Sequence, residues 1–139
     1  MKIVINRCYG GYSLSPKAMK MLAKKKGRKC YFFKRDFENG KDDRYIPIPM
    51  NKAGMFCTAF DTDKLPKVMT NEWYVEHQID SRPDDRTDPD LISVVEKLGE
   101  EAGGECAELE IIEIPDGVQY TIEEYDGIEH VAEVHRTWG

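Results

Sequence analysis

Residues 2–27 read KIVINRCYGGYSLSPKAMKMLAKKKG, and this stretch decides the fold class. The run Lys2–Asn6 is short, apolar and β-branched, which favours a buried strand. Ser15-Pro16 supplies an N-cap and a first helical residue, so a helix is expected over 17–26, apolar on one face and lysine-rich on the other. Gly27 suits its C-terminal cap. A strand followed by an amphipathic helix indicates mixed α and β structure.

The rest of the chain contains more strand than helix. A second helix is expected to open at Asp88-Pro89 and to stop at Gly103-Gly104. Asp-Gly pairs at 116–117 and 126–127 predict hairpin turns. Strands are expected at 29–34, near 55–60, and at 73–79, 109–114 and 118–124. Residues 45–49 are expected as an edge strand or extended arm because of their prolines, and 128–138 as a strand or irregular arm. The pattern predicts an α+β fold, mainly antiparallel sheet with two helices, in a single compact domain, 1–139.

Composition is that of an ordinary globular protein. A length of 139 residues suits one domain, and a hydrophobic fraction of 40% with 33% charged residues is typical of soluble chains. No apolar stretch approaches the roughly 20 residues of a membrane span, and no secretory leader is expected. The four cysteines, Cys8, Cys30, Cys57 and Cys106, form no Cys-x-x-Cys pair, so free thiols are expected rather than a metal site.

Charge is distributed unevenly along the chain. The net charge is −6, yet residues 1–41 are strongly basic, whereas from Asp88 onward Lys97 and Arg136 are the only basic residues. Such opposed blocks favour neutralisation within one chain or head-to-tail contacts between copies. Two separately solvated faces are the alternative.

The turn after the first strand is one candidate anion site. Arg7 supplies a fixed charge, Tyr9 lies in the same turn, and Gly10-Gly11 let the backbone approach a ligand beside the start of the helix. The stretch is not a P-loop, because no Gly-Lys-Ser/Thr follows. The alternative is a turn that needs glycine only for its geometry.

The C-terminus is the second candidate. Arg136 can grip a phosphate, and Trp138 or Tyr120 can stack on a base. Alternatively, Trp138 fills the core and Arg136 pairs with a nearby acid. Arg82 and Arg86, set among prolines and aspartates, form a third candidate, although such arginines commonly pair with neighbouring carboxylates.

Residues for catalysis are poorly represented. His77, His130 and His135 accompany no Gly-x-Ser-x-Gly nucleophile motif. Glu123 and Glu124 are neighbours on a predicted strand, so their side chains point to opposite faces. The sequence therefore predicts a binding protein rather than an enzyme, with no metal and no cofactor.

Several motifs lie near the two ends of the chain. Residues 5–15 read INRCYGGYSLS and residues 94–99 read VVEKLG; EIPDG stands at 113–117, YDGIEH at 125–130 and HRTW at 135–138. Together they resemble a group of small tailed-phage proteins, identified as the phage anti-Thoeris sponge family.

The resemblance implies a phage anti-defence protein that sequesters the signal nucleotide glyco-cyclic ADP-ribose in the host cytoplasm without cleaving it. It implies a homo-oligomer, with a hexamer as one candidate assembly, and ligand pockets between subunits. Some family members also hold cyclic oligonucleotides at separate sites. No membrane and no nucleic acid polymer are expected as partners.

The resemblance also assigns residues to the ligand pocket. Arg136 and Arg86 are carried over as binding residues, and Gln119, Tyr120 and Leu109 stand where the family has amide and aromatic pocket residues. Leu109 would stack more poorly than an aromatic ring. A rival interpretation makes the acidic C-terminal half a nucleic-acid mimic that inhibits a host nuclease or CRISPR effector.

Overall fold

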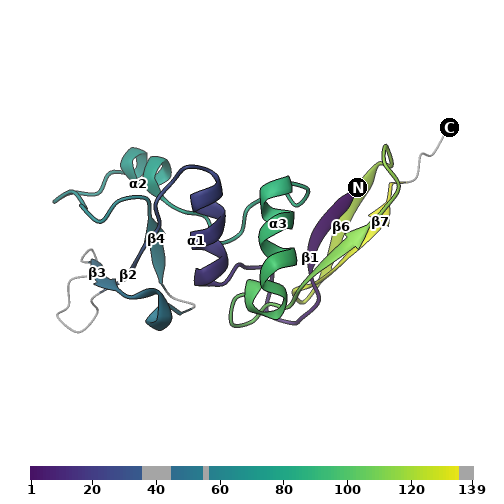
Figure 1. Ribbon diagram of the computed structural model, residues 1–139, viewed down its shortest axis with the longest axis horizontal. Coiled ribbons are helices and arrows are strands. Elements are labelled where there is room, and N and C mark those ends of the chain that lie inside the picture. The colour runs from purple at the N-terminus through teal and green to yellow at the C-terminus, as the bar shows by residue number, and fades with distance from the viewer. Residues whose placement is uncertain (36–44, 55–56, 135–139) are drawn as a thin grey trace.

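Residues 1–35, 45–54 and 57–134 of this computed structural model form successive layers of helix and antiparallel sheet (Figure 1). The α+β prediction is confirmed. The elements are β1 (Lys2–Asn6), α1 (Pro16–Lys25), β2 (Tyr31–Arg35), β3 (Tyr45–Ile48), η1 (Met50–Lys52), β4 (Thr58–Phe60), α2 (Asn71–His77), α3 (Pro89–Leu98), η2 (Gly99–Ala102), β5 (Leu109–Glu113), β6 (Tyr120–Tyr125) and β7 (Ile128–Glu133).

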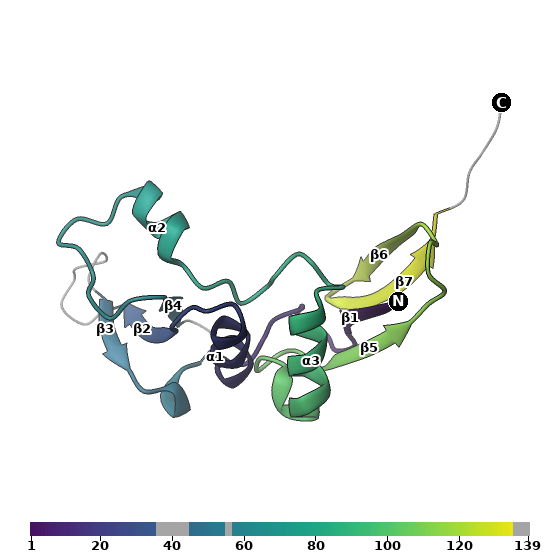
Figure 2. The same ribbon diagram turned by 45° about the horizontal axis from the view of Figure 1, so that its top comes forward.

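The first strand is covered on both faces. β1 pairs with β5 in antiparallel register, from Lys2 opposite Glu113 to Asn6 opposite Leu109. α3 packs against this pair, and β7 of the β6–β7 hairpin contacts β1 (Figure 2). Ile3, Val4, Ile5 and Asn6 are therefore all buried. A strand enclosed on both sides has no polar face, which explains its continuous apolar run.

A second group of layers surrounds the sheet of order β3-β2-β4. Side chains alternate along β2: Phe32 joins the core cluster that includes the α1 residues, whereas Phe33 contacts Phe60, with ring centroids 5.7 Å apart. Trp73 and Tyr74 of α2 lie 5.1 and 5.5 Å from the Phe60 ring. Aromatic contacts thus fix α2 against β4.

The two long helices begin and end at the expected types of residue. The Ser15 hydroxyl accepts a hydrogen bond from Ala18 N at 3.1 Å, and Asp88 caps α3 in the same way. Lys26 binds Asp88 at 2.8 Å and Asp90 at 3.0 Å, which ties the end of α1 to the start of α3. One hydrophobic cluster, from Val4 to Ala102, runs through β1, α1, β2, β4 and α3.

Two element predictions were wrong. Residues 73–79 were predicted as a strand, but 71–77 form α2, so the described residues contain three α-helices rather than two. Thr70 caps this helix by accepting from Trp73 N, and the alternation of apolar and polar residues misled the prediction. α3 ends at Gly99, where φ is +56°, and the short η2 intervenes before Gly103-Gly104.

The predicted turns were correct only in part. Asp126-Gly127 closes the β6–β7 hairpin as predicted, with Tyr125 opposite Ile128. The Asp116-Gly117 turn makes no hairpin, because β5 and β6 belong to different sheets. β3 is an edge strand containing Pro47, as expected. No helix in the described ranges is long and apolar enough to cross a membrane.

Candidate functional site

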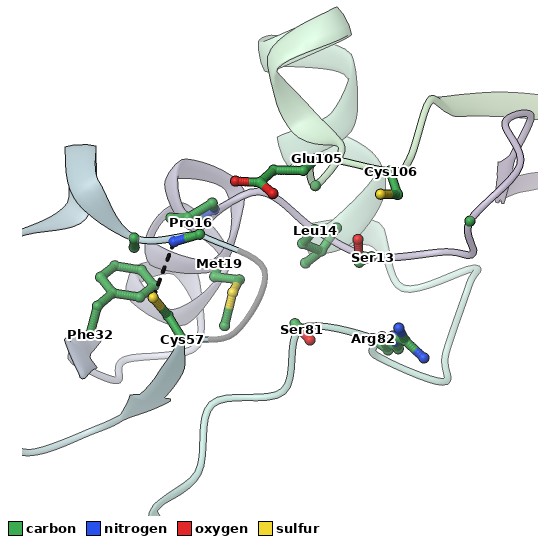
Figure 3. Close-up of a pocket in the computed structure, with 14 residues that line it drawn as sticks. Ser13, Leu14, Pro16, Met19, Phe32, Cys57, Ser81, Arg82, Glu105 and Cys106 are labelled. Carbon is green, nitrogen blue, oxygen red and sulfur yellow. Dashed lines mark hydrogen bonds between the residues drawn. The ribbon is translucent and has the colours of Figure 1, made fainter. Parts of the chain in front are cut away.

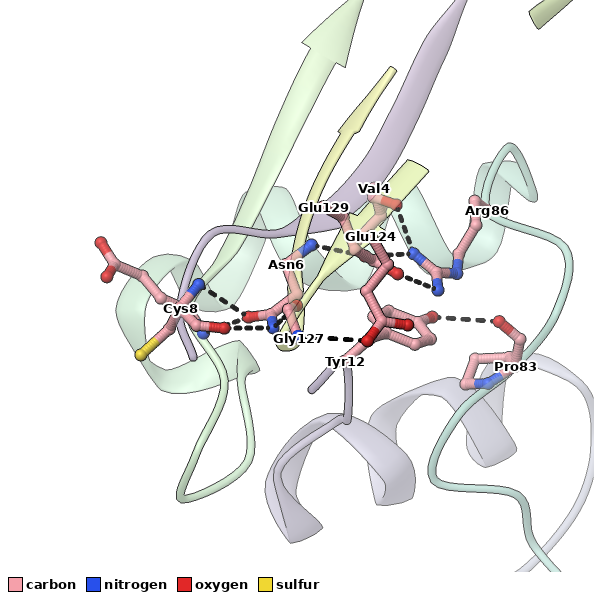
Figure 4. Close-up of polar contacts among 10 residues, drawn as sticks. Val4, Asn6, Cys8, Tyr12, Pro83, Arg86, Glu124, Gly127 and Glu129 are labelled. Atoms are coloured by element: carbon pink, nitrogen blue, oxygen red, sulfur yellow. Dashed lines mark hydrogen bonds and ion pairs between the residues drawn. The ribbon is translucent and has the colours of Figure 1, made fainter. Parts of the chain in front are cut away.

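A buried polar network lies where β1, β7 and the glycine turn meet (Figure 4). Among the described residues, Asn6 and Glu129 are the buried polar side chains, with 0% and 6% exposure. Buried polar groups need hydrogen-bond partners to offset their lost hydration. The partners of these two residues define the candidate site.

Asn6 joins three segments of the chain. Its backbone N–H donates to Glu129 Oε1 at 2.8 Å, and its Nδ2 donates to the carbonyls of Gly127 and Cys8, each at 2.7 Å. Its Oδ1 accepts from Glu108 N at 2.9 Å and from Cys8 N at 3.2 Å. The amide therefore fastens β1 to the β6–β7 turn and to the segment before β5.

Glu129 and Arg86 form a two-point ion pair. Arg86 Nη1 and Nη2 donate to the two carboxylate oxygens at 2.8 and 2.9 Å, and Nη1 also donates to Val4 O at 3.1 Å. The guanidinium carbon lies 3.4 Å from the centroid of the Tyr12 ring. Tyr12 in turn donates its hydroxyl to Pro83 O at 3.1 Å. This geometry combines bidentate pairing with cation–π stacking.

The pKa shifts follow from these contacts. Burial alone would raise the pKa of the Glu129 carboxyl, but hydrogen bonds from Arg86 and Asn6 N outweigh it, so the pKa lies below its ordinary value. Burial would lower the pKa of Arg86, and the Glu129 hydrogen bonds outweigh it in the same way, so this pKa is raised. Burial raises the pKa of Tyr12 despite the nearby Arg86 charge. Glu129 and Arg86 are therefore both charged at neutral pH.

The glycines of the turn allow two backbones to approach closely. Gly10 and Gly11 have φ values of +112° and +101°. A Cβ on Gly10 would lie 2.6 Å from Cys106 Cβ, and a Cβ on Gly127 would overlap Gly11 N. Gly10 N donates to Asp126 O at 3.4 Å. The turn therefore needs its glycines for backbone geometry, which was the alternative to anion binding. Anion binding at this turn stays a prediction.

An open hollow of ≈ 480 Å³ adjoins the network. Its size falls within the range of small-molecule sites. Acidic side chains outnumber the two arginines, and Arg86 is already neutralised by Glu129. A phosphate bound in this hollow of a single chain would therefore face mainly carboxylates. The lining residues are Gly10, Gly11, Tyr12, Arg82, Asp84, Arg86, Glu124, Asp126, Gly127 and Glu129.

A second, more enclosed pocket lies near the start of α1 (Figure 3). Its volume of ≈ 120 Å³ is well below that of nucleotide sites. Met19, Phe32, Cys57 and Cys106 are among its lining residues, and Cys57 Sγ accepts from Gly54 N at 3.1 Å. All four cysteines are free, and Cys30 is the buried one. No cluster of His, Cys, Asp or Glu suited to a metal ion occurs within the described ranges.

The predicted binding residues fall into two groups along the β6–β7 hairpin. Six of them lie around its turn end: Arg7, Tyr9, Gly10, Gly11, Arg86 and Leu109. Gln119 and Tyr120 lie at the other end, where Val134 N donates to Gln119 O and Tyr120 pairs with Glu133. At about 3.3 Å per residue, the four steps from Glu124 to Tyr120 span roughly 13 Å. Arg136 and Trp138 are outside the described residues.

Several turn-end residues have structural partners. Arg7 pairs with Glu110 at 3.3 Å, and Leu109 packs against the hydrophobic core. Arg86 pairs with a carboxylate, which was the alternative considered for it. Tyr9 is 61% exposed. Of this group, Tyr9 offers the most accessible surface for a ligand.

No family model, curated protein or solved structure matches this chain. The site must therefore be interpreted from its own geometry and from the motifs.

Sequence patterns alone did not predict the roles of Asn6, Tyr12 and Glu129. Asn6 directly follows the apolar run of β1, and a polar residue ending a buried strand is a usable signal. Glu129 looked like one more acid in an acidic half. Its burial depends on the packing of β7 against β1, which no local pattern reveals.

Proposed function

We propose that this protein binds and sequesters a cyclic ADP-ribose-type signal nucleotide, glyco-cyclic ADP-ribose, between copies of itself in the host cytoplasm and does not cleave it. The resemblance of its terminal motifs to the phage anti-Thoeris sponge family is the starting point. In this role the protein is a phage anti-defence factor that lowers the free concentration of a host immune signal.

The observation that carries the proposal is the separation of the motif residues into two groups at opposite ends of one hairpin. The turn group, with Arg86 and Tyr9, and the Gln119-Tyr120 group lie roughly 13 Å apart along the hairpin, and the hollow at the turn end is lined by neither Gln119 nor Tyr120. Two copies packed end to end would bring one group of each chain together. A pocket between subunits therefore accommodates both groups.

The hairpin is suited to such packing. Within the described residues, β6 and β7 form a sheet of two strands, so each has a backbone edge without a strand partner. Two-stranded sheets are marginally stable by themselves, and open edges pair readily with other chains. Tyr125 and Val134, 78% and 44% exposed, leave apolar surface near the two ends of this hairpin. These features support assembly through the hairpin.

Charge also favours a pocket completed by a second chain. The hollow at the turn end is mainly acidic, so it needs added cations to hold a diphosphate. In the proposed pocket Arg136 of a second copy supplies one; it stands three residues after Glu133, the last residue of β7, in the sequence. Tyr120 supplies an aromatic face for the adenine.

Binding by variants tests this arrangement. Tyr120→Ala is expected to weaken glyco-cyclic ADP-ribose binding by about tenfold, the value of one base–aromatic stack. Thr121→Ala, on the opposite face of β6, is the matched control and should bind like the unmodified protein. Equal affinities for all three proteins in calorimetry would contradict the placement of the pocket.

A further inference from the structure

A cationic pocket lies at the C-terminal end of α1, away from the hairpin. It has a volume of ≈ 240 Å³, and its lining contains four basic side chains and no acidic one: Lys20, Lys24, Arg28, Lys29, Cys30 and Tyr31. Clusters of like charge are unfavourable unless a counter-charge neutralises them.

Local structure explains why these cations converge. Lys20 and Lys24 are one helical turn apart and share a face of α1. Gly27, with φ at +74°, reverses the chain, and Arg28 N donates to Ala23 O at 2.8 Å. The turn places Arg28 and Lys29 beside the lysines of the helix. The carbonyls of Leu22, Ala23 and Lys24 near the end of α1 accept hydrogen bonds from this turn.

Three other lysines of the basic segment are neutralised within the chain, in contrast to those of this pocket. Lys2 pairs with Glu96, Lys17 with Glu101, and Lys26 with Asp88 and Asp90. Lys20, Lys24 and Lys29 form no ion pair with any other residue that the structure describes. Among the described residues, the three ammonium groups of this pocket therefore lack a carboxylate partner, whereas Arg28 pairs with Asp61.

Arg28 is held in a fixed position at the pocket. Its Nη2 lies 3.1 Å from Asp61 Oδ2 and donates to the carbonyls of Glu76 and Gln78 at 3.2 and 3.4 Å. Tyr31 adds an aromatic surface to the lining. A fixed guanidinium, three ammonium groups without an ion-pair partner among the described residues, and a ring match the chemistry of phosphate recognition.

We infer that this pocket at the end of α1 binds an oligophosphate anion. The pocket is too small for a folded macromolecule, and its cations suit two or three linked phosphates, whether free or part of a nucleic acid backbone. The site is separate from the hairpin residues of the proposed nucleotide pocket and does not depend on that function.

Inorganic triphosphate is the probe for this pocket. Titration of the full chain by calorimetry at low salt should show binding that weakens as salt is added. Lys24→Glu should reduce the affinity at least about tenfold, because one charge-assisted hydrogen bond is lost and a repulsive carboxylate is added. Lys25→Glu is the matched control: it changes the same net charge on the same helix outside the lining, and should change the affinity less than about threefold.

The outcomes separate the alternatives. Equal losses in the Lys24→Glu and Lys25→Glu variants would overturn the inference, because net charge rather than the pocket would then govern binding. Binding of a ten-nucleotide single strand without any binding of triphosphate would also overturn it, since an extended surface would be the site. Triphosphate binding that is lost in Lys24→Glu and kept in Lys25→Glu supports it, and circular dichroism shows whether both variants are folded.

Discussion

Arg86, in the connector before α3, donates two hydrogen bonds, of 2.8 and 2.9 Å, to Glu129 on β7. Asn6 N donates to the same carboxylate. The pair thus joins the connector before α3, the first strand and the last strand. Asn6 and Glu129 belong to the motifs at 5–15 and 125–130, and Arg86 belongs to the connector, so the contact joins segments that lie far apart in the sequence.

Removal of Arg86 is expected to destabilise the protein strongly. Arg86→Ala leaves the Glu129 carboxylate buried without its cation, which costs about 3 kcal/mol in the free energy of unfolding. Urea denaturation followed by fluorescence measures this loss. Arg82→Ala, at an exposed arginine of the same connector, should change stability by less than about 0.5 kcal/mol. Similar midpoints for both variants would show that the ion pair is not structural.

Acid should weaken the same contact. The pKa of Glu129 is lowered in the folded protein, so its contribution to stability is complete above the unfolded value, near 4.5, and is lost as pH falls through the folded pKa. Glu129→Gln should therefore be less stable than the unmodified protein at pH 7, and the difference should shrink below pH 4.5. Thermal melts at several pH values measure the difference, and a constant gap down to pH 2 would be inconsistent with the assignment.

The contact between the two glycine turns is expected to be intolerant of any side chain. Gly127→Ala places a Cβ against Gly11 N at a φ of +92°, so both overlap and backbone strain oppose folding. Gly117→Ala is the control, because φ there is +79° but no atom lies within 4 Å. The control should lose about 1 kcal/mol from strain alone, and Gly127→Ala clearly more. Equal losses would mean that the turns do not pack as described.

Thiol reactivity should distinguish Cys30 from the other cysteines. Burial raises the pKa of the Cys30 thiol to about 11, so little thiolate is present near pH 8. Cys8, Cys57 and Cys106 are partly exposed. Iodoacetamide followed by peptide mass spectrometry should modify Cys30 in native protein far more slowly than in urea. Equal rates in the two conditions would place Cys30 at the surface.

Arg136→Ala is expected to abolish ligand capture while the fold is retained, because Arg136 is proposed to grip a phosphate in the pocket between copies. Gel filtration and circular dichroism of the variant serve as folding controls. Capture at full stoichiometry by this variant would move the site away from the C-terminus.

Local chemistry predicted much of the fold. Ser15-Pro16 and Asp88-Pro89 marked the helix starts because capping is a short-range interaction. The strand predicted at 73–79 failed because the apolar–polar alternation of so short a segment is a weak signal, while the helical packing of Trp73 and Tyr74 on Phe60 depends on distant β4. Tertiary contacts override such short patterns.

The candidate site was predicted less well than the fold. Arg86 was identified, yet its partner Glu129 was not, because nothing local separates that residue from the surrounding exposed acids. Gly10 and Gly11 were noted for close approach to a ligand, and the structure shows close approach to Gly127 and Cys106. A glycine in a sequence can indicate that another group approaches the backbone closely, but it does not identify that group.

Capture and release of glyco-cyclic ADP-ribose measures directly whether the protein sequesters this nucleotide without cleaving it. The protein is incubated with the nucleotide, freed of unbound ligand by filtration and heat-denatured, and the supernatant is analysed by mass spectrometry. For a sponge that binds without cleaving, the nucleotide should disappear from the filtrate and return intact, in stoichiometric amount, after denaturation. Ligand that stays in the filtrate, or that returns cleaved, would contradict the proposed function.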